Sequence, residues 1–150
     1  MIYIASDHGG FELKNKIIDY LKSKDYQVED CGPKELDKED DYPDFIYPCA
    51  VQVGKGAVED RGIVLGRSGQ GEAIVANKAK GVRAALYYGG NLKIVKLSRQ
   101  HNNSNVLSLG ADFITFEQVT EAIDLWLATE FEGGRHQRRI DKISKLEHSL

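Results

Sequence analysis

The feature that most constrains the fold of this chain is the alternation of short apolar runs with longer stretches of helical periodicity. The apolar runs lie at residues 2–5, 26–29, 63–65, 82–86 and 105–109. The helical stretches lie at residues 11–24, 44–53, 72–79, 91–100, 116–130 and 136–148. Strands separated by helices of this length predict right-handed βαβ crossovers with helices on both faces of a parallel sheet. We therefore expect an α/β protein, a Rossmann-like three-layer α/β/α sandwich with a five-stranded parallel sheet and an extending C-terminal helix.

Length and composition limit the kind of protein that this can be. A chain of 150 residues with 41% hydrophobic and 29% charged residues predicts a globular protein with one domain over residues 1–150. A net charge of −3 gives no general attraction to nucleic acid, and no run approaches the roughly 18 apolar residues of a membrane span. Cys31 and Cys49 lack metal-site spacing, and the first residues lack the features of a signal peptide. We expect a cytoplasmic protein with reduced thiols and no nucleic-acid or membrane partner.

Parallel α/β sheets bind ligands outside the carboxyl ends of their strands, so the residues after each strand are the candidates for a site. These segments are residues 6–10, 66–72 and 110–112. The segment 101–103 precedes the fifth strand, and its place relative to this edge depends on how its loop folds.

The glycine-rich segment Gly66–Gly71 joins a strand to a helix, and Glu72 stands at the helix entrance. Its G-x-x-G-x-G spacing is neither the dinucleotide fingerprint nor a P-loop, because no Lys-Ser/Thr pair follows. Backbone amides at residues 68–71 can converge on an anion, or the glycines can simply allow a tight turn. Glu72 either complements the helix dipole or performs chemistry beside a bound anion.

Several other polar residues have both a structural and a functional interpretation. Asp7 and His8 could cap a helix or contact substrate hydroxyls, and His101 could end a surface helix. The arginines at positions 135, 138 and 139 could form a solvated helix face. The acidic segment 35–44 fits a solvated loop better than a metal site because it lacks an EF-hand pattern. Pro48 is expected to kink its helix or delay its start.

A set of collinear motifs resembles one known family over nearly the whole chain. The motifs are Ala5-Ser-Asp-His-Gly-Gly-Phe-Glu-Leu-Lys14, Asp41-Tyr-Pro43, G-x-S-G-x-G-E-x-x-x-A-N-K from Gly66, Arg83-Ala-Ala85, Ser98-Arg-Gln-His-Asn-Asn103 and Gly134-Arg-His-Gln-Arg-Arg139. Together they resemble the type B ribose-5-phosphate isomerases, a family that includes galactose-6-phosphate isomerase subunits. Many members have a cysteine where this chain has Gly66. The chain resembles the other branch, in which a glutamate at the position of Glu72 is the base.

The resemblance implies roles for individual residues. Glu72 would transfer the proton, Ser68 would help to position the oxygen-bound proton, and His101 would open the sugar ring. Asp7 and Asn102 would hold hydroxyls, while His8, Arg135 and Arg139 would bind the phosphate. Further substrate contacts are expected from Tyr42, Arg67, Gly69, Gln70 and Gly71.

The same resemblance implies an assembly and a reaction. No cofactor or metal is expected, and the substrate would be a sugar phosphate, with ribose 5-phosphate preferred and a six-carbon sugar phosphate as the alternative. A non-catalytic sugar-phosphate sensor is a weaker alternative, because a sensor need not keep a base. The expected assembly is a homodimer with shared active sites that can pair into a tetramer, in which the arm at residues 134–150 packs on the partner subunit. Two positions depart from the family pattern: Asp112 stands where an arginine is common, and Arg67 where a glycine is usual.

Overall fold

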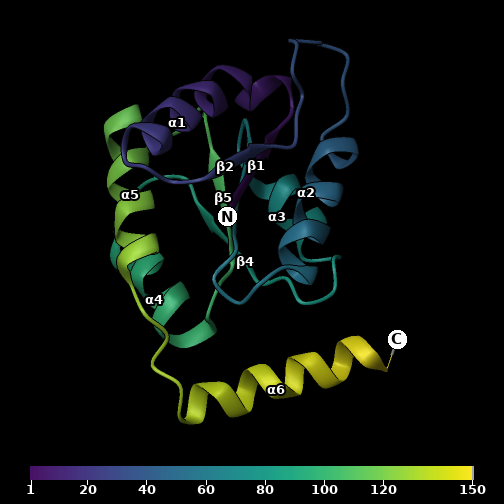
Figure 1. Ribbon diagram of the computed structural model, residues 1–150, viewed down its shortest axis with the longest axis vertical. Helices are drawn as coiled ribbons and strands as arrows, with labels where there is room; N and C mark the ends of the chain where they lie inside the picture. The colour runs from purple at the N-terminus through teal and green to yellow at the C-terminus, as the bar shows by residue number, and fades with distance from the viewer. Residues whose placement is uncertain (150) are drawn as a thin grey trace.

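The computed structural model, which describes residues 1–149, contains a five-stranded sheet with the order β2-β1-β3-β5-β4 (Figure 1). Each pair of neighbouring strands is parallel, which confirms the predicted sheet. The second and fourth strands begin at residues 28 and 84, slightly further along the chain than the predicted starts at residues 26 and 82. The strands are β1 Ile2–Ser6, β2 Val28–Asp30, β3 Arg61–Gly66, β4 Ala84–Tyr87 and β5 Val106–Gly110.

Helices cover both faces of the sheet, which gives the predicted three layers (Figure 1). One face carries α1 (Phe11–Ser23), α4 (Lys93–Asn102) and α5 (Phe116–Ala128). The other face carries α2 (Pro43–Lys55) and α3 (Gln70–Ala76). A short 3-10 turn, η1 (His8–Gly10), links β1 to α1.

The two layers of core follow from the twofold alternation of side chains along each strand. In β3, Ile63 and Leu65 belong to the core beneath α1, α4 and α5, whereas Val64 belongs to the core beneath α2 and α3. Trp126 of α5 is fully buried in the first core, and its indole N–H donates to Ser104 Oγ at 2.8 Å. Both faces of the sheet are therefore covered, as a parallel sheet requires.

The start of α2 differs from the prediction. Pro48 does not delay this helix, because α2 begins at Pro43 and continues through Pro48 to Lys55. Pro43 occupies the beginning of the helix, where the missing proline N–H removes no intrahelical hydrogen bond. The third helix is shorter than predicted and ends at Ala76.

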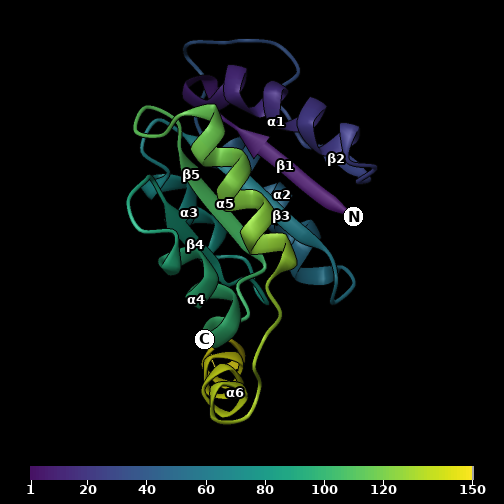
Figure 2. The ribbon, with the colours of Figure 1, turned by 90° about the vertical axis from the view of Figure 1, so that its left-hand side faces the viewer.

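The C-terminal helix α6 (Arg135–His148) lies across the amino ends of the strands, apart from the three layers (Figure 2). Gly133 and Gly134 precede it with φ values of 67° and 58°. Two hydrogen bonds from the Gly81 amide to the Glu147 carboxylate attach it to the body, with donor–acceptor distances of 3.3 and 3.2 Å. Within residues 1–149, no helix is long and apolar enough to span a membrane.

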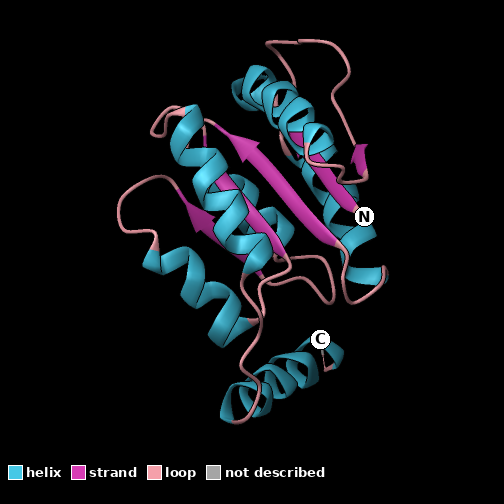
Figure 3. Ribbon diagram, turned by 60° about the vertical axis from the view of Figure 1, so that its left-hand side comes forward, coloured by secondary structure: helices cyan, strands magenta, loops and turns pink. Residues whose placement is uncertain are grey.

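The strand ends form two different edges of the sheet, which we call the carboxyl edge and the amino edge. The strand arrows point away from α6, so the carboxyl ends of the strands lie at the far end of the molecule from that helix (Figure 3). The amino ends face α6. This polarity determines which of the predicted site residues meet within one chain.

Candidate active site

Glu72 lies at the carboxyl edge of the sheet, in the first turn of α3. Only 4% of the residue is exposed. Its carboxylate lies against Gly66, the last residue of β3, so closely that a Cβ atom at residue 66 would overlap it. The absence of a side chain at Gly66 therefore makes room for the Glu72 carboxylate.

The environment of Glu72 favours its neutral form more than water does. Burial raises the pKa of the Glu72 carboxyl, and the negative charge of Asp7 raises it further. The backbone N–H of Glu72 itself opposes this shift. A carboxylate whose pKa is raised in this way can accept a proton from a weak carbon acid more readily than an exposed glutamate can.

The loop before Glu72 is held in one conformation by its neighbours. Gly69 has φ = 75° and stands at the N-terminus of α3, where a Cβ would meet the backbone of Leu109 at 2.8 Å. The Ser108 hydroxyl donates to the Gly69 carbonyl at 2.6 Å. The Gln70 amide points at Ser68 Oγ across 3.4 Å. The backbone of this loop thus leads directly into the helix turn that holds Glu72.

Tyr42 closes one side of the same loop. A Cβ at Gly71 would lie 2.8 Å from Cζ of the Tyr42 ring, so the two residues are in close contact. Tyr42 is 36% exposed and stands just before α2. It therefore lines the carboxyl edge next to the loop at residues 66–71.

Asp7 has the structural role that the sequence left open. Its Oδ1 accepts hydrogen bonds from the amides of Gly9 at 2.8 Å and Gly10 at 3.2 Å, which caps η1. The residue is 8% exposed, and its charge acts on Glu72. The Asp7 carboxylate thus both caps η1 and raises the pKa of Glu72.

His8 has a partner that the sequence analysis missed. Its Nδ1 lies 2.6 Å from Asp40 Oδ1, and its backbone N–H donates to the same oxygen at 3.0 Å. Asp40 belongs to the acidic segment that was expected to be a solvated loop, yet its side chain is only 5% exposed. The run of acids in this segment contained no periodicity that could have indicated which of them turns inward.

Arg67 and Asp112, the two positions that depart from the family pattern, form an ion pair with each other. Arg67 Nη1 and Asp112 Oδ2 are 3.4 Å apart, with 66% and 48% of the side chains exposed. Arg67 also lies beside η1, because a Cβ at Gly9 would meet Arg67 Cγ at 2.6 Å. The guanidinium group is thus close to His8, at the rim of the carboxyl edge.

His101 and Asn102 lie at the other edge of the sheet. They form the last turn of α4, and the backbone carbonyl of Asn102 accepts a hydrogen bond from Arg83, the residue before β4. Within one chain they are therefore separated from Glu72 by the length of the strands. The His101 ring stacks on His136 of α6, with ring centres 4.2 Å apart and planes inclined by 11°.

Arg135 and Arg139 are both exposed on α6, at the same amino edge. Their separation of four residues puts them on one side of the helix. The buried side of that helix instead contains His136 and Ile140. One chain thus brings Asp7, His8, Tyr42, Arg67, Ser68, Gly69, Gln70, Gly71 and Glu72 to the carboxyl edge, and His101, Asn102, Arg135 and Arg139 to the amino edge.

Among residues 1–149, two clusters have donor atoms close enough to suggest a metal ion: Asp7, His8 and Asp40, and His101, Glu132 and His136. In the first, His8 and Asp40 already share a 2.6 Å hydrogen bond. In the second, the two imidazole rings are stacked, and lone pairs in parallel planes do not converge on one ion. The second cluster therefore does not have the geometry of a transition-metal site.

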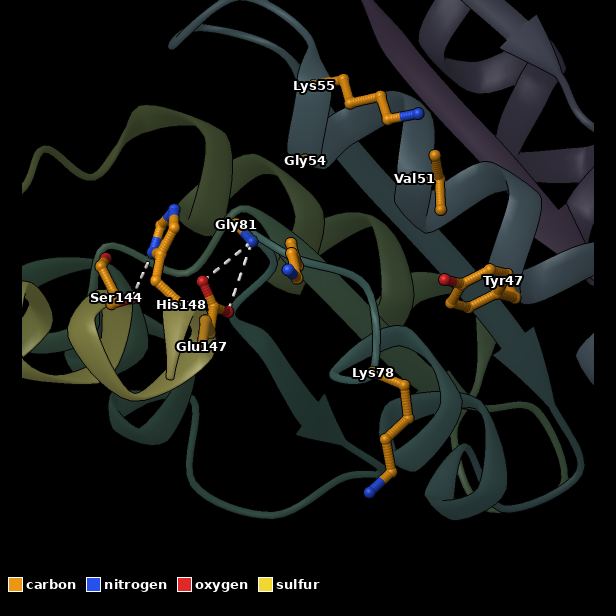
Figure 4. A pocket seen from close by; sticks show the side chains of 10 residues that line it. Tyr47, Val51, Gly54, Lys55, Lys78, Gly81, Ser144, Glu147 and His148 are labelled. Atoms are coloured by element: carbon orange, nitrogen blue, oxygen red, sulfur yellow. Dashed lines mark hydrogen bonds between the residues drawn. The ribbon is translucent and has the colours of Figure 1, made fainter. Parts of the chain in front are cut away.

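A pocket of about 620 Å³ lies between α2, the segment around Gly81 and α6. Figure 4 shows Lys55, Lys78 and Tyr47 around it, with Glu147 bonded to the Gly81 amide. None of the predicted catalytic residues lines this pocket. The residues at the carboxyl edge are therefore a better candidate for the reaction than this pocket.

Comparisons with known proteins identify the family to which the chain belongs. The model of the ribose/galactose isomerase family matches residues 2–143, and the chain belongs to this family. Ribose-5-phosphate isomerase B from Mycoplasma genitalium, solved with bound ribulose 5-phosphate, is 46% identical with a TM-score of 0.94 and coverage of 99% and 97% of the two chains. The corresponding Clostridium thermocellum structure is 41% identical with a TM-score of 0.92 and the same coverage. Ribose-5-phosphate isomerase B from Mycolicibacterium paratuberculosis is 38% identical over 99% of this chain and 92% of the relative.

Proposed function

We propose that the protein is an aldose–ketose isomerase that interconverts D-ribose 5-phosphate and D-ribulose 5-phosphate, a reaction of the pentose phosphate pathway. The observation that supports this most strongly is the full-length match to a protein solved with ribulose 5-phosphate. A buried carboxylate with a raised pKa at the carboxyl edge supplies the base that such a reaction needs. We propose a cytoplasmic location, in keeping with the two free thiols.

Glu72 is the proton-transfer base in this proposal. It takes the proton from C2 of the open aldose, which leaves an enediolate with its negative charge on the former aldehyde oxygen. The hydroxyl proton on O2 then passes to that oxygen, and Glu72 returns its proton to C1, which gives the ketone at C2. Backbone amides of residues 68–71 and the Ser68 hydroxyl would stabilise the negative charge on oxygen.

The second half of the site would come from a partner subunit. His101 and Asn102 are at the opposite edge from Glu72 in one chain, so a shared site in a homodimer would bring them together. Arg135 and Arg139, exposed on α6, are then available to bind the phosphate of a substrate held by the partner's Glu72. His8 and Arg67 would contribute positive charge from the same chain as Glu72, and two such dimers could form a tetramer.

Substrate preference is tested by a coupled assay that compares ribose 5-phosphate with galactose 6-phosphate and allose 6-phosphate at matched concentration. The proposal expects the highest kcat/KM for the five-carbon sugar. A preference for a six-carbon phosphate would replace the proposed substrate but keep the isomerase. Binding without turnover of any of the three would instead indicate a sensor and contradict the enzymatic role of Glu72.

A further inference from the structure

The Asp40 carboxylate is joined to His8 by two hydrogen bonds on one oxygen. Asp40 Oδ1 accepts the backbone N–H of His8 at 3.0 Å and lies 2.6 Å from His8 Nδ1. The other oxygen, Oδ2, is buried and has no hydrogen-bond partner among residues 1–149. A buried carboxylate with a free oxygen is costly unless a cation lies beside it. His8 is the cationic side chain in direct contact with it.

The loop that presents Asp40 is anchored at its base. Lys14 is fully buried, and its Nζ donates to Asp30 Oδ1 at 2.7 Å and to the Pro33 carbonyl at 2.8 Å. Closer to Asp40, its amide donates to the Asp37 carbonyl at 3.3 Å, which closes a local turn. The base of the loop is thus anchored to the body, and Asp40 lies in a hydrogen-bonded turn that contacts His8.

The charged groups around His8 shift the pKa of its imidazole. The hydrogen bond to Asp40 raises the pKa of the His8 imidazole, and Asp7 adds to this effect. Burial and the nearby Arg67 guanidinium act in the opposite direction. These are the charged groups that face His8 from η1, from the loop before α2 and from the loop after β3. Their net effect keeps the ring protonated to higher pH than a free histidine.

We propose that Asp40 is a positioning residue that holds His8 as an imidazolium, with Nδ1–H bonded to Asp40 and Nε2–H free to bind the substrate phosphate. The assignment of His8 to the phosphate rests on the proposed function. An imidazolium donates a charge-assisted hydrogen bond to a phosphate dianion, whereas neutral imidazole with its proton on Nδ1 offers only a lone pair at Nε2. Asp40 thereby extends phosphate binding to higher pH than a free histidine would allow.

The test is the pH dependence of KM for ribose 5-phosphate in the parent protein and in Asp40→Asn. Asparagine keeps the shape and the acceptor oxygen but removes the charge, so the pKa of His8 should fall. The two proteins should have similar KM values below both His8 pKa values and above both. At pH values between the two His8 pKa values, the KM of Asp40→Asn should be higher than that of the parent protein by roughly ten- to a hundredfold, which is the range for a lost charged hydrogen bond.

Two further variants separate charge from shape. Glu39→Gln removes one carboxylate from the same exposed loop and should leave the KM profile unchanged. Asp40→Ala removes the acceptor as well as the charge, so the ring loses its anchor, and at pH values where His8 is protonated in both variants the KM of Asp40→Ala should exceed that of Asp40→Asn. In Asp40→Asn, kcat should change little, because the phosphate is bound equally in the ground and transition states. Superimposable KM profiles for the parent and Asp40→Asn would overturn the proposal.

An NMR titration keeps this test independent of the isomerase assignment. The ring carbon resonance of His8, identified by its loss in His8→Asn, reports the His8 pKa directly in the parent and in Asp40→Asn. Inorganic phosphate should perturb this resonance in the parent more at a pH below the His8 pKa than above it. An unshifted pKa in Asp40→Asn, or a phosphate response that does not follow His8 protonation, contradicts the role of Asp40. Failure to isomerise ribose 5-phosphate would contradict the proposed function alone.

Discussion

The carboxyl and amino edges of the sheet contain different halves of the chemistry that the family resemblance implies. The carboxyl edge holds a buried acid, Glu72, with a helix-capping aspartate, Asp7, and a backbone loop around it. The amino edge holds exposed arginines on α6 and a half-buried histidine, His101, on α4. The first half is built from strand ends and tight turns, and the second from helix ends and an arm.

The two halves of the site differ in how firmly the fold holds their side chains. Glu72 is fixed by close packing against Gly66, so its position depends on the core of one subunit. Arg135 and Arg139 are solvent-exposed, so they gain a fixed position only when something docks against α6. Proton transfer requires the more rigid half, whereas phosphate binding tolerates side chains that become ordered on contact.

The largest effect on kcat is expected from a substitution of Glu72 at the carboxyl edge. Glu72→Gln retains the shape of the side chain and removes the base, so kcat should fall by roughly 10²–10⁴-fold with little change in thermal stability. Steady-state kinetics and a melting curve on the same preparation measure both quantities. Near-normal kcat in a folded Glu72→Gln protein would exclude this residue as the base.

The second prediction asks whether the two edges of different subunits combine. Arg139→Ala should raise KM strongly, and its activity should be negligible at substrate concentrations well below that KM. Mixing it with Glu72→Gln should give hybrid dimers with one intact site, and therefore about half of the parental activity per hybrid dimer. Subunit exchange is verified by mass spectrometry. If hybrids form and no activity returns, Arg139 does not act on the partner's site.

The smallest effect is a difference between reaction directions caused by a change at the amino edge. His101→Asn should impair turnover of ribose 5-phosphate, whose cyclic form must open first. It should impair ribulose 5-phosphate less, because that sugar cannot close into a furanose. Initial rates in both directions at saturating substrate measure the contrast. Equal losses in both directions would indicate that His101 serves a step other than ring opening.

The sequence predicted the sheet well because its information is local to each strand and helix. Strands such as β3 are recognisable from an apolar run that ends in glycine, and Glu72 could be placed at the edge because the loop after that strand leads into the helix turn that contains it. The motifs also indicated His101, but not the edge at which it lies. That edge follows from the direction of α4, which returns the chain to the start of β5.

The Asp40–His8 contact was beyond the reach of sequence patterns. The two residues are 32 positions apart, and Asp40 is one of several acids in an irregular loop. Loop conformation depends on anchors such as the bond from Lys14 to the Pro33 carbonyl, which no periodicity encodes. The ion pair between Arg67 and Asp112 was likewise unforeseen as a contact, although both positions were recognised as unusual.

The close approach of the Glu72 carboxylate to Gly66 restricts how this fold can change its base. The space above residue 66 accommodates either a side chain from the strand or the carboxylate from the helix, and it cannot hold both in their present positions. A lineage that moved the base from one position to the other would have to change both residues. A side chain at residue 66 alone would force the Glu72 carboxylate to move, and loss of Glu72 alone would remove the proposed base. The position of the base in this fold thus depends on two residues together, on a backbone that need hardly differ.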